Sequence, residues 1–167
     1  TNQIHQSQTK SPKVLIVEDN HINQVVLKTM LKRLDIESKT ADHGGKALTI
    51  LEQAHANDEV FDLILMDLNM PIMDGFEATT YIRAYEAEQD IPPTPILCLT
   101  ANVVEGQEDI CTAYGMNAYL GKPVNMTILA SLMSFWTSGE TVNGATTDNL
   151  AVELSTVSQA YTTGLIF

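Results

Sequence analysis

The sequence has little cysteine and histidine, which argues against a disulfide-stabilised or metal-thiolate framework. Its two cysteines, Cys98 and Cys111, fall inside an apolar strand pattern and a helical pattern. We therefore expect free thiols in a reducing, cytoplasmic compartment and no disulfide. The four histidines show no ligand spacing, so we expect neither a zinc nor an iron site.

Basic residues and long apolar runs are also scarce. Nine Lys and Arg stand against 21 Asp and Glu, a formal net charge of -12, and Lys122 is the only basic residue after Arg83. Nucleic-acid binding needs clustered basic residues, so we expect no nucleic-acid partner. No apolar run reaches the roughly 20 residues of a membrane span, and the polar start, Thr1 to Ser11, lacks the features of a signal peptide. We expect a cytoplasmic segment without direct membrane contact. The chain opens without an initiator methionine. One alternative is therefore that it is a fragment of a larger protein, such as the cytoplasmic part of a membrane-anchored sensor kinase.

Short apolar runs alternate with helical patterns along most of the chain. The predicted strands are Val14–Val17, Ile36–Ala41, Asp62–Met66, Ile96–Leu99 and Ala118–Leu120. Five helices are predicted. The first covers Ile22–Leu34, the second starts near Gly44, and the third contains Phe76–Ile82. The fourth and fifth span Val104–Tyr114 and Met126–Trp136. Each parallel crossover needs a helix-sized connection. The alternation therefore predicts an α/β fold with a doubly wound, five-stranded parallel sheet and five helices.

The chain divides into three predicted segments. Residues 1–12 form a polar N-terminal extension, residues 13–136 the folded domain, and residues 137–167 a tail or linker. Thr, Ser, Asn, Gly and Ala dominate the last segment, and the alternation of strand and helix stops there, which favours a linker. The alternative is a docking segment that ends with the apolar Leu165, Ile166 and Phe167.

Polar side chains follow four of the predicted strands, at the edge where open α/β sheets bind ligands. These positions are Glu18 and Asp19, Asp67, Thr100, and Lys122. Three carboxylates brought close together repel one another unless a cation lies among them. Oxygen ligands favour Mg²⁺, with Mn²⁺ as a plausible substitute. The sequence therefore predicts a magnesium site beside Asp67.

A carboxylate nucleophile, a divalent metal ion and an ammonium group are typical of phosphoryl transfer. We expect Asp67 to attack phosphorus, while the metal ion, Lys122 and the Thr100 hydroxyl each hold one phosphoryl oxygen. Backbone amides near Asn69 and Ala101 are further candidate donors. The small side chain of Ala101 leaves access for the phosphoryl group.

Four motifs together resemble the receiver domain of two-component response regulators, over about Lys13 to Trp136. They are VLIVEDN with Glu18 and Asp19, LILMDLNMPIMDG with Asp67, LTAN with Thr100 and Ala101, and GMNAYLGKPV with Tyr119 and Lys122. Each motif alone is weak, but all four in this order are highly specific. The segments EDNHINQVV, LTAN and GMNAYLGKPV are most similar to receivers fused to hybrid histidine kinases.

The resemblance implies a flavodoxin-like strand order 2-1-3-4-5 and a defined metal site. Asp67 would be phosphorylated by a histidine kinase domain or a histidine phosphotransfer protein. Asp19, Asp67 and the backbone carbonyl of Asn69 would bind the metal ion, with Glu18 acting through water. The chain would catalyse its own phosphorylation and dephosphorylation, so whether it counts as an enzyme is left open.

The resemblance also implies a conformational switch. The Thr100 hydroxyl would turn toward the phosphoryl group, and the ring of Tyr119 would rotate inward to fill the vacated space. The face formed by the fourth helix, fifth strand and fifth helix would then change shape, as a shift between populated states. The bond between Lys122 and Pro123 resembles the cis peptide of the family.

Receivers of hybrid kinases usually pass the phosphoryl group to a phosphotransfer domain that docks beside the first helix. Ile22, Val25 and Val26 are candidates for this contact, and core packing is the preferred interpretation for Val25 and Val26. A stand-alone, single-domain response regulator is the alternative. Two other functions are weighed: an aspartate-nucleophile phosphatase of the haloacid dehalogenase type, which needs a second aspartate where this chain has Asn69, and a phosphate-independent pseudo-receiver.

Two candidate residues, Asp19 and Tyr119, have structural alternatives, and Asp74 is left outside the site. Asp19 is a possible N-cap of the first helix, because Asp is a preferred capping residue. Asp74 with Gly75 is predicted to start the third helix and shape the turn. Tyr119 has the alternative of simple packing against the fourth helix.

Overall fold

The computed structural model describes residues 11–101 and 105–137. Its strands are β1 (Lys13–Val17), β2 (Glu37–Ala41), β3 (Leu63–Asp67), β4 (Ile96–Thr100) and β5 (Ala118–Gly121). Its helices are α1 (His21–Arg33), α2 (Gly44–Ala56), α3 (Gly75–Glu88), α4 (Gln107–Tyr114) and α5 (Met126–Thr137). Strands and helices alternate without exception in this part of the chain, as the periodicity predicts.

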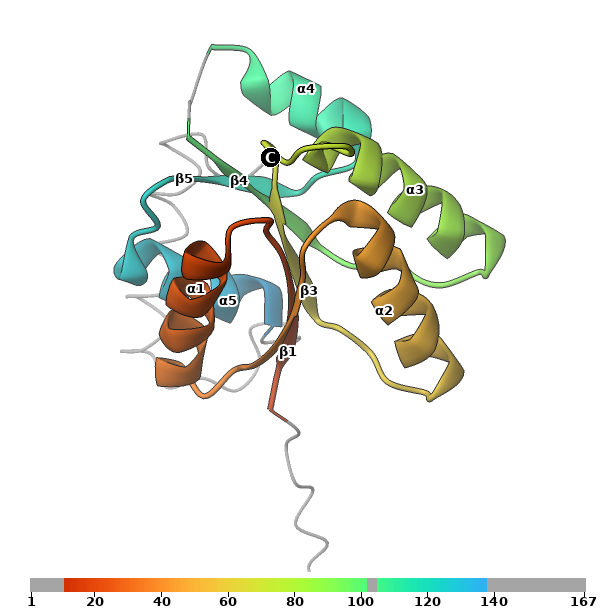
Figure 1. The fold of residues 1–167 in the computed structure, drawn as a ribbon, viewed down its shortest axis with the longest axis horizontal. Coiled ribbons are helices and arrows are strands. Elements are labelled where there is room, and N and C mark those ends of the chain that lie inside the picture. Colours follow the sequence, from red (N-terminus) through yellow and green to blue (C-terminus); the bar gives the residue numbers. More distant parts are fainter. Residues whose placement is uncertain (1–10, 102–104, 138–167) are drawn as a thin grey trace, which may run out of the picture.

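The strands form one parallel sheet in the order β2-β1-β3-β4-β5, which confirms the predicted flavodoxin-like fold. Helices α1 and α5 cover one face of the sheet, and α2, α3 and α4 cover the other (Figure 1). Both faces of the central strands are therefore closed to solvent. For this reason β3 and β4 are buried at every residue and read in the sequence as continuous apolar runs.

Each face of the sheet has its own apolar cluster, because successive strand side chains point to opposite faces. In β1, Leu15 and Val17 pack on the side of α2 and α3, while Val14 and Ile16 pack on the side of α1 and α5. The strand is thereby fixed in register from both sides. A shift by one residue would exchange the two sets of side chains.

The helix starts identify which polar residues serve as caps. Asn20 caps α1, because its side chain accepts a hydrogen bond from the backbone N–H of Asn23. The alternative that Asp19 is the cap is therefore wrong. Asp74 caps α3 by accepting from Glu77 N–H, which confirms the predicted helix start. The Asp19 carboxylate consequently remains available to the carboxyl edge of the sheet.

The fourth helix is shorter than predicted. It begins at Gln107 instead of Val104, and Val104 lies outside the described residues. Gly106 precedes the helix with a φ of 81°, a left-handed conformation that is incompatible with a helix interior. The periodicity of the apolar residues could not reveal this backbone conformation.

The exposed side of α1 differs from the prediction. Val25 and Val26 are about half exposed, at 49% and 51%, so the preferred core interpretation of these residues is wrong. The inward face of α1 is instead formed by Gln24, Leu27 and Leu31. Ile22 is more exposed still, at 72%, which leaves an apolar surface at the start of this helix.

The predicted extension and tail fall almost entirely on residues 1–10 and 138–167, outside the described residues. Among the residues that the structure describes, none of the helices has the length and apolar character needed to cross a membrane. Cys98 and Cys111 are buried free thiols whose sulfur atoms are 3.7 Å apart. Burial raises the pKa of both thiols, so both stay protonated at neutral pH.

Candidate functional site

Strands β1, β3, β4 and β5 are neighbours in the sheet, and predicted site residues lie at or directly after the carboxyl end of each one. Glu18 directly follows β1, Asp67 ends β3, Thr100 ends β4, and Lys122 directly follows β5. Since these strands are parallel neighbours, their carboxyl ends meet. Residues separated by up to 104 positions in the sequence are thereby placed in contact.

Three carboxylates form a compact cluster at this edge. One oxygen each from Glu18, Asp19 and Asp67 lie within 4.8 Å of one another. Glu18 and Asp67 are each only 1% exposed, whereas Asp19 is exposed. Buried carboxylates this close together repel strongly unless cations neutralise them. The cluster is therefore suited to a small, hard divalent cation approached from the side of Asp19.

Lys122 supplies one positive charge to the cluster. Its ammonium nitrogen lies 3.0 Å from Asp67 Oδ1 and 3.2 Å from Glu18 Oε2. Partial burial by itself would lower the pKa of Lys122, but hydrogen bonds and charge from Asp67 and Glu18 outweigh it and raise the pKa. The lysine is therefore fully charged at neutral pH. Its backbone N–H donates to the Thr100 carbonyl at 2.8 Å, and the bond to Pro123 is cis.

The Glu18 carboxylate is oriented by residues that the sequence analysis did not single out. Its Oε1 accepts from the backbone N–H of Asn20 at 3.2 Å and from the Asn23 side chain at 3.3 Å. The buried Gln24 side chain donates to the Glu18 carbonyl at 2.7 Å and to Asp42 Oδ1 at 3.3 Å. The available signal was a polar Gln24 at a position where the helical spacing calls for an apolar residue.

Asn69 contacts the phosphoacceptor candidate through its backbone. Its N–H donates to Asp67 Oδ1 at 3.1 Å, while its side chain is exposed. The same Asp67 oxygen also accepts from Lys122, so two donors hold the carboxylate in one orientation. Both contacts use Oδ1, and neither uses the second carboxylate oxygen, Asp67 Oδ2.

Thr100 and Tyr119, the predicted switch residues, are both buried. The Thr100 hydroxyl oxygen lies 3.4 Å from the side-chain nitrogen of Gln107 in α4, and the following residue, Ala101, is exposed. Tyr119 belongs to the apolar cluster that contains Cys98 and Cys111. Burial, and then the charge of Glu108, raises the pKa of Tyr119. The ring is therefore already inside the domain.

Gly75 determines how closely α3 approaches the end of β3. A Cβ atom at this position would lie 2.4 Å from the Asp67 carbonyl oxygen and 3.0 Å from the Leu68 Cα. These contacts are with backbone, which cannot move without displacing Asp67. The sequence predicted a turn at Asp74 and Gly75 but not this packing, which depends on a strand and a helix coming together.

Gly75→Ala is expected to destabilise the domain by about 1 to 3 kcal/mol, because the added methyl group overpacks the junction of β3 and α3. Denaturant unfolding followed by circular dichroism measures this change. Gly45→Ala is the control, since a Cβ there meets only the ring of His43, at 3.2 Å. Equal stability of the Gly75 variant and the parent would contradict the proposed packing.

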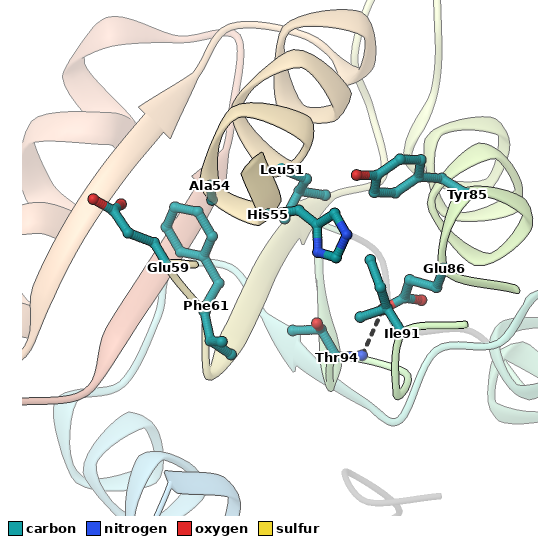
Figure 2. Close-up of a pocket in the computed structure, with 10 residues that line it drawn as sticks. Leu51, Ala54, His55, Glu59, Phe61, Tyr85, Glu86, Ile91 and Thr94 are labelled. Atoms are coloured by element: carbon teal, nitrogen blue, oxygen red, sulfur yellow. Dashed lines mark hydrogen bonds between the residues drawn. The ribbon is translucent and has the colours of Figure 1, made fainter. Parts of the chain in front are cut away.

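A separate pocket lies between α2 and α3, away from the carboxylate cluster (Figure 2). Phe61 and Thr94, which line it, precede β3 and β4, so the pocket is at the amino edge of the sheet. Its Glu86 accepts from Thr94 N–H and from Arg83, both at 2.6 Å. The Glu86 carboxylate therefore links the loop before β4 to helix α3 and stabilises the fold at this edge.

Comparison with known proteins agrees with this geometry. The model of the "Response regulator receiver domain" family matches residues 14–134. The chain is 37% identical over 129 residues to "Sensor protein GacS" of Pseudomonas syringae pv. syringae, which covers 77% of this chain and 14% of that protein. It spans 5 to 15% of the length of the curated kinases considered.

Two solved structures are similar in both fold and sequence. The receiver domain of Ssk1, co-crystallised with the histidine phosphotransfer protein Ypd1 of Saccharomyces cerevisiae, gives a TM-score of 0.69 at 33% identity, over 77% of this chain and 90% of that chain. The receiver domain of the sensor histidine kinase PA1611 from Pseudomonas aeruginosa PAO1 gives 0.62 at 35% identity, over 78% and 100%. That structure has a magnesium ion coordinated in its active-site cleft. With the predicted sheet order and a carboxylate cluster at the expected edge, this chain belongs to the family of response regulator receiver domains.

Proposed function

We propose that this domain is a phosphorelay switch in which Asp67 accepts a phosphoryl group from a phosphohistidine. The observation that carries the proposal is the contact of the Lys122 ammonium with both Asp67 and Glu18, at 3.0 and 3.2 Å. It places a positive charge beside the candidate nucleophile. Phosphoryl transfer depends mainly on such positioning and charge neutralisation.

The reaction exchanges one bond for another. A carboxylate oxygen of Asp67 forms a bond to phosphorus, and the bond between phosphorus and the donor histidine nitrogen breaks. The released electron pair stays on that nitrogen, and the imidazole leaves as a neutral ring after proton uptake. Lys122 and the Thr100 hydroxyl each hold one phosphoryl oxygen, and the exposed Ala101 leaves room for the group to enter.

The carboxylate cluster fits a bound Mg²⁺ ion. Three carboxylate oxygens within 4.8 Å of one another, with Lys122 as partner, leave the described site with excess negative charge. Asp19, Asp67 and the Asn69 carbonyl would hold the ion, and Glu18 would act through water. When bound, the ion neutralises charge on the transferred group. Mn²⁺ accepts the same oxygen ligands and would substitute.

Phosphoramidate with Mg²⁺ is expected to add one phosphoryl group to the purified protein, because a small donor needs only the site and not a partner. Intact mass spectrometry measures the added mass. Chelation of the metal is expected to abolish it, and Mn²⁺ to restore it. Absence of labelling at saturating Mg²⁺ and donor would overturn the proposed function.

The partner proposed for this site is a histidine kinase domain or a histidine phosphotransfer protein. The exposed side chains Ile22 and Val26 lie on α1, and Val26 borders a groove with Lys122 and Pro123. An apolar helix surface that adjoins the reacting lysine allows a donor helix to reach Asp67. The co-crystal of the Ssk1 receiver domain with Ypd1 supports this kind of partner.

Ile22→Ala is expected to slow phosphoryl transfer from phosphorylated Ypd1, used as a probe, by about tenfold, as expected for loss of an apolar interface contact. Labelling by phosphoramidate should stay at the parental rate, since the Ile22 side chain is apolar and 72% exposed and has no group that can bind the metal ion or the phosphoryl group. Radiolabel transfer followed over time distinguishes the two reactions. Val60→Ala serves as control, because Val60 is 73% exposed but lies at the opposite edge of the sheet.

The similarity to sensor kinases favours a receiver that belongs to a hybrid histidine kinase and relays the group onward. Its other output is a change in the face formed by α4, β5 and α5. A single-domain response regulator remains the alternative. A phosphatase of the haloacid dehalogenase type is disfavoured because Asn69 stands where that mechanism needs an acid. Steady turnover of phosphate monoesters by the purified protein would reverse this preference.

A further inference from the structure

Helix α4 begins differently from the three helices that precede it. Helices α1, α2 and α3 each start after a residue whose side chain accepts a backbone N–H of the first turn: Asn20, His43 and Asp74. Gly106 provides no such side chain before α4, and this helix has only eight residues. Uncapped short helices are marginal by themselves. The start of α4 therefore depends on contacts with the rest of the domain.

The first residue of α4 makes such a contact. Gln107 is 7% exposed, and its side-chain nitrogen donates to the Thr100 hydroxyl oxygen at 3.4 Å. The next two residues, Glu108 and Asp109, are exposed. The Gln107 side chain therefore extends inward, from the start of the helix to the strand end that adjoins the phosphoacceptor site.

Tyr119 is already packed inside the domain in this structure, at 4% exposure and in one cluster with Cys98 and Cys111. Starting from this conformation, the Tyr119 ring has no further inward rotation to make. The contact between Gln107 and Thr100 offers a direct connection between the site and α4. At 3.4 Å this hydrogen bond from Gln107 to the Thr100 oxygen is long, so its loss costs little when the hydroxyl turns.

We propose that Gln107 is a positioning residue, which holds the Thr100 hydroxyl toward α4 until phosphorylation of Asp67 draws that hydroxyl away and releases the start of the helix. The inference rests on the proposed function, because it needs a phosphoryl group at Asp67. Thr100 Oγ1 accepts from Gln107, so the O–H of Thr100 is the group that a charged phosphoryl oxygen at Asp67 would accept, and making that bond turns the hydroxyl oxygen away from the Gln107 nitrogen. Phosphorylation therefore shifts Thr100 from one arrangement to the other.

The test compares hydrogen exchange of the α4 amides in Gln107→Met with the parent protein. Methionine has a similar length and helix propensity but cannot donate a hydrogen bond. In the unphosphorylated variant we expect α4 to open about 3- to 10-fold more often, which is the effect of one lost hydrogen bond. Phosphorylation should then add little further opening, whereas in the parent it should produce the full increase.

A double-mutant cycle with Thr100→Val separates this contact from a general loss of packing. If the two side chains act through each other, the effect of Gln107→Met on α4 exchange disappears in the Thr100→Val background. Thr112→Val, an exposed change in the same helix between residues of similar size and helix propensity, is the control and should leave exchange unaltered. Additive effects of the two substitutions, or parental exchange in Gln107→Met, would overturn the inference. Failure of the parent to take up a phosphoryl group would instead refute the proposed function.

Discussion

Asp67→Asn is expected to eliminate Mg²⁺-dependent labelling by phosphoramidate, with a loss of at least about 10³-fold. The amide is isosteric with the carboxylate but is not a nucleophile, and loss of a nucleophile has effects of this size or larger. Intact mass spectrometry provides the measurement. Because the parental fold is kept, circular dichroism should show no change in the spectrum.

The same substitution is expected to raise the free energy of unfolding in the absence of divalent metal by about 1 kcal/mol. It removes one charge from a cluster in which three carboxylate oxygens lie within 4.8 Å, and Lys122 keeps its contact with Glu18 at 3.2 Å. Mg²⁺ should stabilise the parent through preferential binding to the folded state and have little effect on the variant. Equal stabilisation of both proteins by Mg²⁺ would contradict the assigned metal site.

Asp74→Asn is a suitable matched control for Asp67→Asn. Asp74 is only seven positions further along the chain, and its exposed side chain caps α3 by accepting from Glu77 N–H at 2.8 Å. Asparagine is an equally good capping residue, so the helix should be retained. Parental labelling of the Asp74 variant would show that the loss in Asp67→Asn is specific to the site.

Lys122→Met is expected to destabilise the domain by about 3 kcal/mol in the absence of divalent metal. The change leaves Glu18 and Asp67, both 1% exposed, without the ammonium that neutralises them, and unpaired buried charges have a cost of this order. Mg²⁺ should restore part of the loss. Denaturant unfolding with and without Mg²⁺ measures both effects.

The labelling rate of Lys122→Met should also fall by about 10²-fold, because the lysine no longer stabilises charge on the transferred group. The contribution of Lys122 to stability has a defined pH range. Since its pKa is raised in the folded protein, the contribution is complete below the unfolded value of roughly 10.4 and is lost as the pH rises through the folded value. At neutral pH the full effect is present.

Lys46→Met provides the control for the lysine substitution. Lys46 pairs with Asp42 at 3.6 Å, and both side chains are about half exposed. Exposed ion pairs contribute little, so we expect a change below about 1 kcal/mol and no response to Mg²⁺. If both lysine variants lost the same stability, burial of the carboxylate cluster would not be the cause.

The alternation of apolar runs and helical spacings was sufficient to predict the α/β architecture, because each strand or helix is encoded by neighbouring residues. Fully apolar runs predicted the central strands, and polar residues at their ends predicted which side chains meet at the carboxyl edge. Asp74 was predicted to start a helix and does so. The role of Asp67 as phosphoacceptor stays a prediction that the labelling experiment tests.

Residues whose function depends on distant partners were not predictable in this way. Gln24 and Gly75 matter through a buried hydrogen bond and a close backbone approach. The helical spacing of Leu27 and Leu31 marks position 24 as inward but does not identify the partner of Gln24, and no local pattern marks the approach at Gly75. The exposure of Val25 and Val26 depends on how α1 is rotated against the sheet, and apolar side chains are common on protein surfaces.

The sequence alone determined the order of the strands and helices, the parallel sheet and the set of polar residues at its edge. These features follow from the spacing of apolar and polar residues along the chain, which is visible within each short segment. Only the tertiary structure decided that Lys122 touches Glu18 across 104 positions, that Tyr119 lies inside, and that Gln107 reaches Thr100. Those contacts join separate elements, so their geometry exists only after the helices have packed on the sheet.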